Sequence, residues 1–268
     1  MSNADAVIAA LRSGYEDLAV LAVTLSDADL AAPSGASEWD VAQVLGHLGS
    51  GAEINQATIT AAVAGKPNPG LDFARSVWAR WDALGRRDLI DGFQSANEAL
   101  IDLYESLDEH ARENLRIEMG FLPEPVDVAM AGRLRLSEFT LHAWDVRVGF
   151  DKTATLSAEG TAQIAAGVGA MVGWLAKPDA VKEHSVIRVT TTEPDLDLAL
   201  RLAGEITAGE ITGEEITGDQ ITDGTLSLPA EAWVRLVTGR LGPGYTPAGI
   251  TATGAADLDL LRRVFPGF

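Results

Sequence analysis

The sequence predicts an α+β protein of two domains, a four-helix bundle followed by a smaller α+β domain. Apolar residues recur at helical spacing through roughly the first 150 residues, and polar or Pro/Gly-rich connections separate the helices. The pattern changes near residues 152–157, and beyond it two segments alternate with period two, as half-buried strands do. We therefore expect one domain over residues 1–152 and another over 153–268.

Four long amphipathic helices account for the first domain. The apolar spacing predicts them over residues 5–24, 38–63, 73–107 and 126–148. Ser37 and Asp40 have the spacing of a helix start, which places the beginning of the second helix there. The third helix can kink or break at Gly85 or Gly92, and the fourth stops at Gly149.

The second domain mixes helices with strands. The predicted elements are a helix over 158–175, strands over 186–192 and 196–202, a strand and helix joined at Pro229, a short strand near Ile250, and a helix over 257–264.

An acidic repeat interrupts this domain at residues 204–224. Isoleucines recur every five residues, at Ile206, Ile211, Ile216 and Ile221. One interpretation is a calcium or ligand loop, and the other is a solvated acidic hairpin or meander whose isoleucines face the sheet. We favour the second, because the spacing matches none of the usual calcium loops.

Composition excludes several classes of function. A net charge of -19 argues against nucleic acid or an anionic membrane as a partner, because phosphate binding needs clustered Lys and Arg. The absence of cysteine excludes disulfides, cysteine-ligated zinc and a protein thiol as nucleophile. The sequence shows neither a signal peptide nor an apolar run of about 18 residues, which predicts a cytoplasmic protein without a membrane-spanning segment.

One stretch of the fourth helix, Arg133 to Asp151, carries the strongest sign of chemistry. Glu138, His142 and Asp145 stand at i, i+4 and i+7, which puts them within about 60° of arc on one helical face. Because the neighbouring leucines turn this face toward apolar packing, such polar side chains need a partner. A metal ion is one candidate.

His47 supplies a third donor, from the inward-facing edge of the second helix. If the second and fourth helices are neighbours, His47, Glu138 and His142 form a two-histidine, one-carboxylate site with the open position expected of a catalytic zinc. The alternatives are a hydrogen-bonded core histidine at His47 and a helix-surface pair at Glu138 and His142. We expect His110 and His184 at the surface.

The segments WDVAQVLGHL and SEFTLHAWDVRVG together resemble the mycothiol-dependent maleylpyruvate isomerase family, a branch of the DinB-like metal-dependent thiol enzymes. The resemblance covers nearly the whole chain. It implies a DinB-like helical bundle followed by a domain related to sterol carrier proteins. It also implies that His47, Glu138 and His142 bind a divalent metal, usually zinc.

The resemblance extends to two further residues. It implies that Asp145 belongs to the active site and that an arginine in a Gly-Arg context of the second domain contributes to it. Arg240 in VTGRL is the best match, with nearby Arg235 as the alternative. Trp39 and Trp144 flank the proposed ligands, where they line a pocket or pack in the core.

The resemblance implies an enzyme that activates mycothiol, or a similar low-molecular-weight thiol, as a metal-bound thiolate. The thiolate then isomerises a cis double bond of an electrophilic small acid or is transferred to the electrophile. Asp145 orients a ligand or handles a proton, and Arg240 pairs a substrate carboxylate. We expect a monomer or homodimer whose partners are these small molecules. The alternative is a non-catalytic small-molecule or lipid-binding protein with a structural metal.

Trp78 and Trp81 stand at helical spacing, and aromatic residues in that pattern are usually buried. We therefore expect both rings to pack in the core and not to bind a cofactor.

Overall fold

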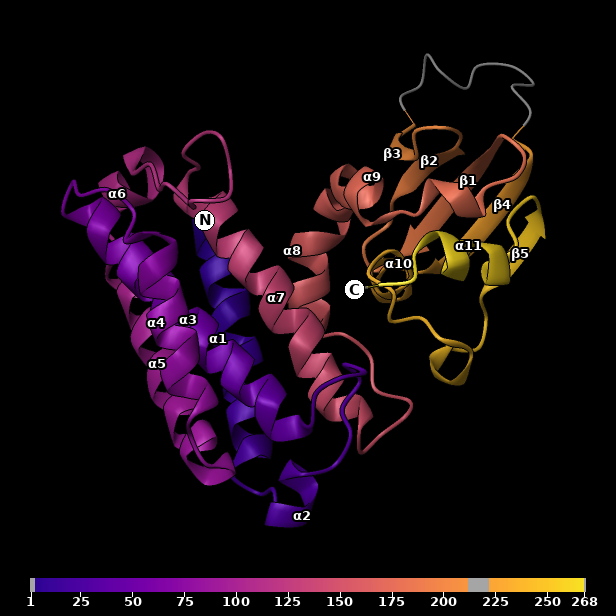
Figure 1. Ribbon diagram of the computed structural model, residues 1–268. Coiled ribbons are helices and arrows are strands. Elements are labelled where there is room, and N and C mark those ends of the chain that lie inside the picture. Colours follow the sequence, from indigo (N-terminus) through magenta and orange to yellow (C-terminus); the bar gives the residue numbers. More distant parts are fainter. Residues whose placement is uncertain (1–2, 212–221, 268) are drawn as a thin grey trace. The chain divides into compact units, whose positions relative to one another are not determined.

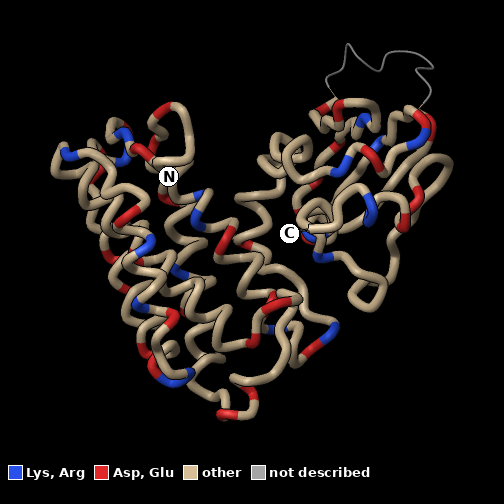
Figure 2. The backbone as a smooth tube through the Cα atoms, viewed as in Figure 1, with Lys and Arg blue, Asp and Glu red and all other residues tan. Residues whose placement is uncertain are grey.

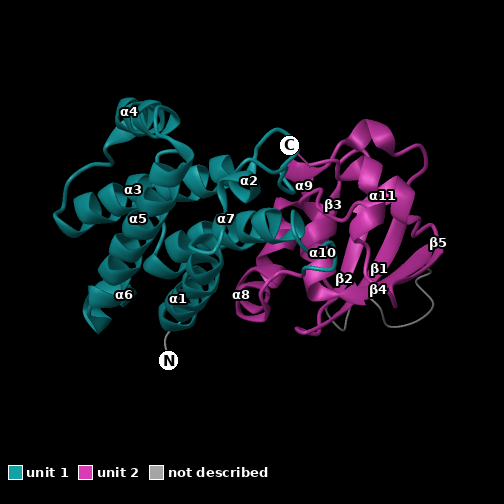
Figure 3. Cartoon of the chain, turned by 90° about the horizontal axis from the view of Figure 1, so that it is seen from below, with its two compact units in different colours: residues 1–154 teal, residues 155–268 magenta. Residues whose placement is uncertain are grey.

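The computed structural model describes residues 3–211 and 222–267 of the chain. It divides into two compact units, residues 1–154 and residues 155–268 (Figure 3). The first unit is helical, and the second combines helices with a five-stranded sheet (Figure 1). The predicted α+β fold class is therefore confirmed.

Four long helices build the bundle of the first unit. They are α1 (Asn3–Ala22), α3 (Val41–Val63), α5 (Arg86–Ser106) and α7 (Val128–Val148). Helix α3 contacts both α5 and α7, and α1 contacts the same two helices. The rings of Phe93 and Phe139 stack 6.3 Å apart in the core between α5 and α7. Shorter helices complete the unit: α2 (Asp27–Leu30), α4 (Gly70–Asp82), which packs on α3, and α6 (Glu109–Asn114).

The predicted helix over 73–107 is in fact two helices. The chain breaks at Gly85, which has extended backbone and precedes the first residue of α5. At Gly92 the helix continues, and a Cβ there would lie 2.8 Å from the ring of Trp81. The glycine at this position therefore serves close packing between α4 and α5.

The second predicted helix begins later than the sequence suggested. Asp40, and not Ser37, caps α3: its carboxylate accepts from the backbone of Gln43, whose side chain accepts from the backbone of Asp40. The preceding segment is held in a loop by a bridge between Pro33 and Asp40. The helices α2 and α6 were not predicted, because each spans too few residues to show a period.

The second unit is built on a sheet with strand order β3-β2-β1-β4-β5. The strands are β1 (Ser185–Thr192), β2 (Asp197–Leu202), β3 (Thr207–Glu210), β4 (Gly224–Pro229) and β5 (Thr251–Gly254). Strands β1 and β4 are parallel, and the other neighbours are antiparallel. Alternate residues of β1 and β4 are buried, as expected of a sheet with one covered face.

The helices of the second unit are α8 (Ala158–Val168), α9 (Val172–Leu175), α10 (Ala230–Val237) and α11 (Leu258–Val264), with 3-10 turns at Gly169–Met171, Pro178–Ala180 and Pro243–Tyr245. The predicted helix over 158–175 is thus interrupted by a 3-10 turn. Trp233 of α10 is fully buried and anchors the core of this unit.

The acidic repeat is described only in part. Ile206 is buried and the residues after it form β3, whereas residues 212–221, including Ile216 and Ile221, lie outside the described residues.

Acidic and basic positions are interspersed along both units (Figure 2). In the described parts of the chain, none of the helices has the length and apolar character needed to span a membrane.

Candidate metal centre

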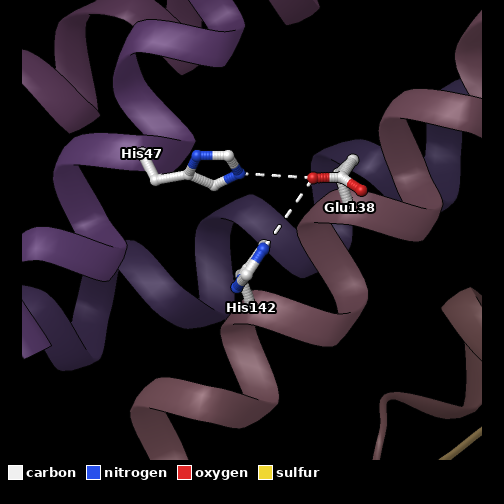
Figure 4. Close-up of side chains that lie close together, drawn as sticks. All are labelled: His47, Glu138 and His142. Carbon is white, nitrogen blue, oxygen red and sulfur yellow. Dashed lines mark hydrogen bonds and ion pairs between the residues drawn. The ribbon is translucent and has the colours of Figure 1, made fainter. Parts of the chain in front are cut away.

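Helices α3 and α7 bring the three predicted metal ligands together. His47 projects from α3, and Glu138 and His142 project from successive turns of α7 (Figure 4). Their nearest ligand atoms all lie within 4.8 Å of one another. Helix α7 packs directly on α3, so the backbones that carry the three side chains are held next to each other. Asp127 caps the beginning of α7.

Two contacts define the geometry. His47 Nε2 lies 3.2 Å from Glu138 Oε2, and His142 Nε2 lies 3.8 Å from the same oxygen (Figure 4). Both histidines therefore turn their Nε2 atoms toward one carboxylate. The Glu138 side chain is 56% exposed, so the cluster opens to solvent on one side.

The cluster changes the acidity of Glu138. The hydrogen bond from His47 is the largest influence and lowers the pKa of Glu138 to about 2, against the opposing effect of partial loss of solvent around the carboxylate. The nearby charges of His142 and Arg135 act in the same direction as the hydrogen bond. Glu138 is therefore a carboxylate at neutral pH, which is the form that binds a cation.

Asp145 lies behind His142 and not among the converging donors. Its side chain is fully buried, and its Oδ2 lies 2.8 Å from His142 Nδ1. A carboxylate on the second ring nitrogen of a histidine fixes the orientation of that ring and favours a metal on Nε2. The i+7 spacing thus places Asp145 one turn beyond the cluster.

The loop before α3 is bound to the same part of α7. The backbone N–H of Gly35 donates to the carbonyl of Asp145 at 2.7 Å, and a Cβ at Gly35 would lie 2.9 Å from Asp145 Cα. The loop between Gly35 and α3 thereby places the ring of Trp39 next to both histidines of the cluster. Its ring centroid lies 4.9 Å from that of His47 and 5.7 Å from that of His142.

Arg135 is a part of the site that the sequence analysis missed. It is buried one turn before Glu138, and its Nη2 donates to the carbonyl of Leu48 at 2.6 Å and to Asn97 Oδ1 at 2.7 Å. Burial lowers its pKa to about 10, which leaves it charged at neutral pH. The available signal was its i, i+3 spacing from Glu138 on an otherwise apolar face.

A cavity of about 1090 Å³ opens beside His47, between the loop before α3 and helices α3, α4 and α5. Trp39, Trp78 and Trp81 contribute to its walls. Trp78 is 43% exposed, so the expectation that it packs in the core was wrong, whereas Trp81 is buried. Trp144 is also buried and donates its Nε1 to the carbonyl of Ala154 at 2.8 Å, as a core residue does.

The donor set fits a divalent metal. Two imidazole nitrogens and one carboxylate oxygen form a three-ligand set of the type found in catalytic zinc sites. A cation at the cluster would replace the proton that His47 shares with Glu138. The buried carboxylate on Nδ1 of His142 supplies the outer partner that such a ligand commonly has.

Arg240 and its alternative Arg235 belong to the second unit. Arg235 is 1% exposed, and its Nε and Nη2 donate to the two oxygens of Glu231, each at 2.7 Å. Arg240 follows the end of α10, where Gly239 has a φ of +74° and the Arg240 N–H donates to the carbonyl of Arg235. The Gly-Arg pair thus forms a helix C-cap that turns the chain at Arg240.

The remaining histidines, His110 and His184, are exposed, as the sequence predicted.

Comparisons with known proteins agree with this fold. Residues 11–147 match the family described as the mycothiol maleylpyruvate isomerase N-terminal domain. A crystal structure of the mycothiol-dependent maleylpyruvate isomerase is 15% identical, with a TM-score of 0.63, over 93% of this chain and 92% of that one. A histidine-to-alanine mutant of that isomerase is 14% identical, with the same TM-score and the same coverage.

No curated protein matches the chain. At these identities the structural likenesses establish the fold, while the family match spans more than half of the sequence and includes all three residues of the cluster. The chain belongs to the mycothiol-dependent maleylpyruvate isomerase family.

Proposed function

We propose that this protein is a metal-dependent enzyme that uses mycothiol, or a similar small thiol, to isomerise or modify an electrophilic small acid. The convergence of His47, Glu138 and His142 from two helices is the observation that carries the proposal. The family match supports the choice of thiol. Zinc is the metal that this donor set favours.

The chain's own residues have distinct tasks in this proposal. His47, Glu138 and His142 hold the metal and leave a position open, and Asp145 keeps the His142 ring in place. When bound, the metal lowers the pKa of a coordinated thiol, so that the sulfur is held as a nucleophilic thiolate near neutral pH. The chain has no cysteine, so the sulfur comes from the cosubstrate.

The reaction follows from a nucleophilic sulfur beside an activated double bond. In the isomerase, a C–S bond forms at one alkene carbon while the π electrons move toward the conjugated carbonyl. The resulting single bond rotates, and expulsion of the thiolate restores the double bond in the trans form. In the transferase alternative, the sulfur stays attached to the electrophile.

We also assign Arg240 to the substrate carboxylate, through a two-point contact of its guanidinium. The burial of Arg235 supports this choice, because its side chain is 1% exposed in an ion pair with Glu231, whereas Arg240 is half-buried and donates to the carbonyl of Thr238 at 3.2 Å. We expect Arg240→Ala to raise the KM for the acid at least tenfold with unchanged metal content. Arg263→Ala, at an exposed position of the same unit, serves as the control. Equal KM values for both variants contradict the assignment.

Metal content tests the central claim. We expect plasma mass spectrometry of the untagged protein to find close to one divalent ion per chain, and His142→Ala to lose most of it, because one of three ligands is gone. His110→Ala removes an exposed histidine and is expected to keep the metal. A wild-type protein that binds no metal after zinc is added contradicts the proposal.

A further inference from the structure

A buried arginine ties three helices together one turn from the metal centre. Arg135 of α7 is 4% exposed, and its Nη2 donates to the carbonyl of Leu48 in α3 at 2.6 Å and to Asn97 Oδ1 in α5 at 2.7 Å. Asn97 is buried as well, and its Nδ2 donates to the carbonyl of Phe93 at 2.8 Å. The guanidinium of Arg135 therefore fixes α7 against α3 and α5 at one point.

This junction lies beside the pair of donors that face each other across the two helices. Leu48 follows His47 directly in α3, and Glu138 comes one turn after Arg135 in α7. A shift of α3 against α7 would change the distance of 3.2 Å between His47 Nε2 and Glu138 Oε2 (Figure 4). Because the bond from Arg135 ends on the carbonyl next to His47, it restrains this shift at the metal centre itself.

Stability does not explain the burial of Arg135. Its Nε is buried without a hydrogen-bond partner among the described atoms, and its Nη2 bonds to two neutral oxygens. Moving a charged group out of water is costly, and well-packed apolar side chains often replace buried charges without loss of stability. The geometry that this arginine imposes is therefore the better reason for its place in the core.

Gly51 leaves the room that the guanidinium needs. It lies one turn after His47 in α3, and a Cβ there would be 2.9 Å from Arg135 Nη1, which is too close for two such atoms. No described side chain other than Arg135 lies within 4 Å of such a Cβ. Glycine weakens a helix interior, so its presence here fits a helix surface that is shaped to receive the arginine.

We propose that Arg135 is a positioning residue of the metal centre, which holds His47 at the distance from Glu138 and His142 at which all three side chains bind one ion. The inference rests on the metal site of the proposed function. Arg135 acts through the backbone of α3 and not as a ligand. When the arginine is removed or displaced, the bundle stays folded, but His47 no longer meets the other two donors.

The zinc affinities of three variants test the inference. We expect Arg135→Met to weaken zinc binding about tenfold, the lower end of the effect of outer partners, because the arginine does not touch a ligand atom. Arg135→Lys keeps the charge and one donor, so it should recover part of the affinity. Arg133→Met is the matched control: Arg133 lies on the same helix, donates to Asn3 at the start of α1, and should be replaceable without effect. Competition with a chromophoric chelator measures all three.

Gly51→Ala separates positioning from stability. Alanine is the better helix former, so the metal-free variant should melt at or above the wild-type temperature. The displaced arginine should still weaken zinc binding by about threefold or more, as expected for residues in contact. In an Arg135→Met background the same change should have no further effect, because the obstructed guanidinium is gone. Gly167→Ala in α8, where a Cβ meets nothing within 4 Å, is the control.

The visible spectrum of the cobalt-substituted protein reports the geometry directly, since the bands of Co²⁺ depend on the number and arrangement of its ligands. We expect Arg135→Met and Gly51→Ala to change these bands, whereas a variant that only destabilises the bundle keeps the wild-type bands in its folded fraction. Affinities and spectra equal to wild type in both variants overturn the inference while the proposed function stands. Lost affinity in Arg135→Met alone, together with a lower melting temperature, shows a structural role and overturns it too.

The wild-type protein separates the inference from the proposed function. A wild type that binds no zinc overturns both. Zinc binding without turnover by any thiol contradicts the proposed function, and the affinities of the variants still decide the role of Arg135.

Discussion

At the scale of single residues, the contact between Asp145 and His142 fixes the orientation of the His142 ring. The fully buried carboxylate of Asp145 lies 2.8 Å from Nδ1, so it holds the ring with Nε2 facing the cluster. We expect Asp145→Asn to weaken zinc binding by about 10- to 100-fold, because loss of such an outer partner reduces the basicity and the order of the ligand. Competition with a chromophoric chelator measures the change.

Asp151→Asn is the matched control for this prediction. Asp151 follows α7 and is exposed, and its carboxylate accepts only from Thr153 among the described contacts. Its replacement should leave zinc affinity unchanged. An Asp145→Asn variant with wild-type affinity would show that Asp145 has no part in ordering the ligand.

The spacing along α7 could be predicted from the sequence, but the role of each side chain could not. A period of 3.6 residues puts Glu138, His142 and Asp145 on one face whatever surrounds them. Which of them faces His47 depends on side-chain rotation and on the Gly35 loop, whose hydrogen bond reaches across more than a hundred residues of sequence. The i, i+3 spacing relates Arg135 to Glu138, but no local pattern shows that this arginine is buried.

At the scale of elements, Arg12 ties α1 to α5. Its guanidinium donates to Glu98, Asp102 and Glu105, at distances between 2.6 and 3.0 Å. The bond from Arg12 is the largest cause that lowers the pKa of Glu105 from its usual value of 4.5. Because a lowered pKa in the folded state means that the unfolded chain binds more protons, this stabilisation is complete above about pH 4.5 and is lost on further acidification.

We expect Arg12→Met to lower the free energy of unfolding by about 1 kcal/mol at pH 7, since the carboxylates are partly exposed and solvent screens them. That change corresponds to about 2 to 4 °C in melting temperature. The difference from wild type should shrink as the pH falls from about 4.5 toward 3. Thermal melts at several pH values measure it.

Arg75→Met provides the comparison, because Arg75 pairs only with Asp72 of its own helix among the described ion pairs, and that carboxylate is almost fully exposed. It should melt as wild type at every pH. A stability difference for Arg12→Met that is constant from pH 7 to pH 3 would exclude the proposed linkage to Glu105.

The periodicity of apolar residues predicts where the helices lie, but it predicts their boundaries and their contacts less well. The region 73–107 keeps one apolar spacing across the break at Gly85, so only the structure separates α4 from α5. Gly49 lies inside α3 as a weak helix former, yet a Cβ there would lie 2.2 Å from Trp81. A glycine is needed at this position because Trp81 of α4 packs against it. The residues around Gly49 in the sequence do not show this contact.

At the scale of the whole molecule, the switch from helical to period-two spacing predicts the α+β class but not the sheet order. Strand β4 pairs in parallel with β1, although β2 and β3 lie between them in sequence. Such pairings depend on tertiary packing and not on the composition of either strand.

Both units have a buried core of their own, and all three proposed metal ligands belong to the first. We therefore expect calorimetry to resolve two transitions, of which zinc raises only one. A ligand at 100 times its Kd stabilises the folded state by about 2.7 kcal/mol. For a unit of this size the midpoint should rise by about 5 to 10 °C.

His142→Ala should remove this response to zinc and leave the second transition in place, because Trp233 and its neighbours make their core without the metal ligands. A shift of both transitions together would mean that the units unfold as one and that zinc stabilises the entire chain. A shift in His142→Ala equal to that of wild type would place zinc elsewhere. The expected pattern, one responsive transition lost with one ligand, ties the metal to the α3–α7 pair.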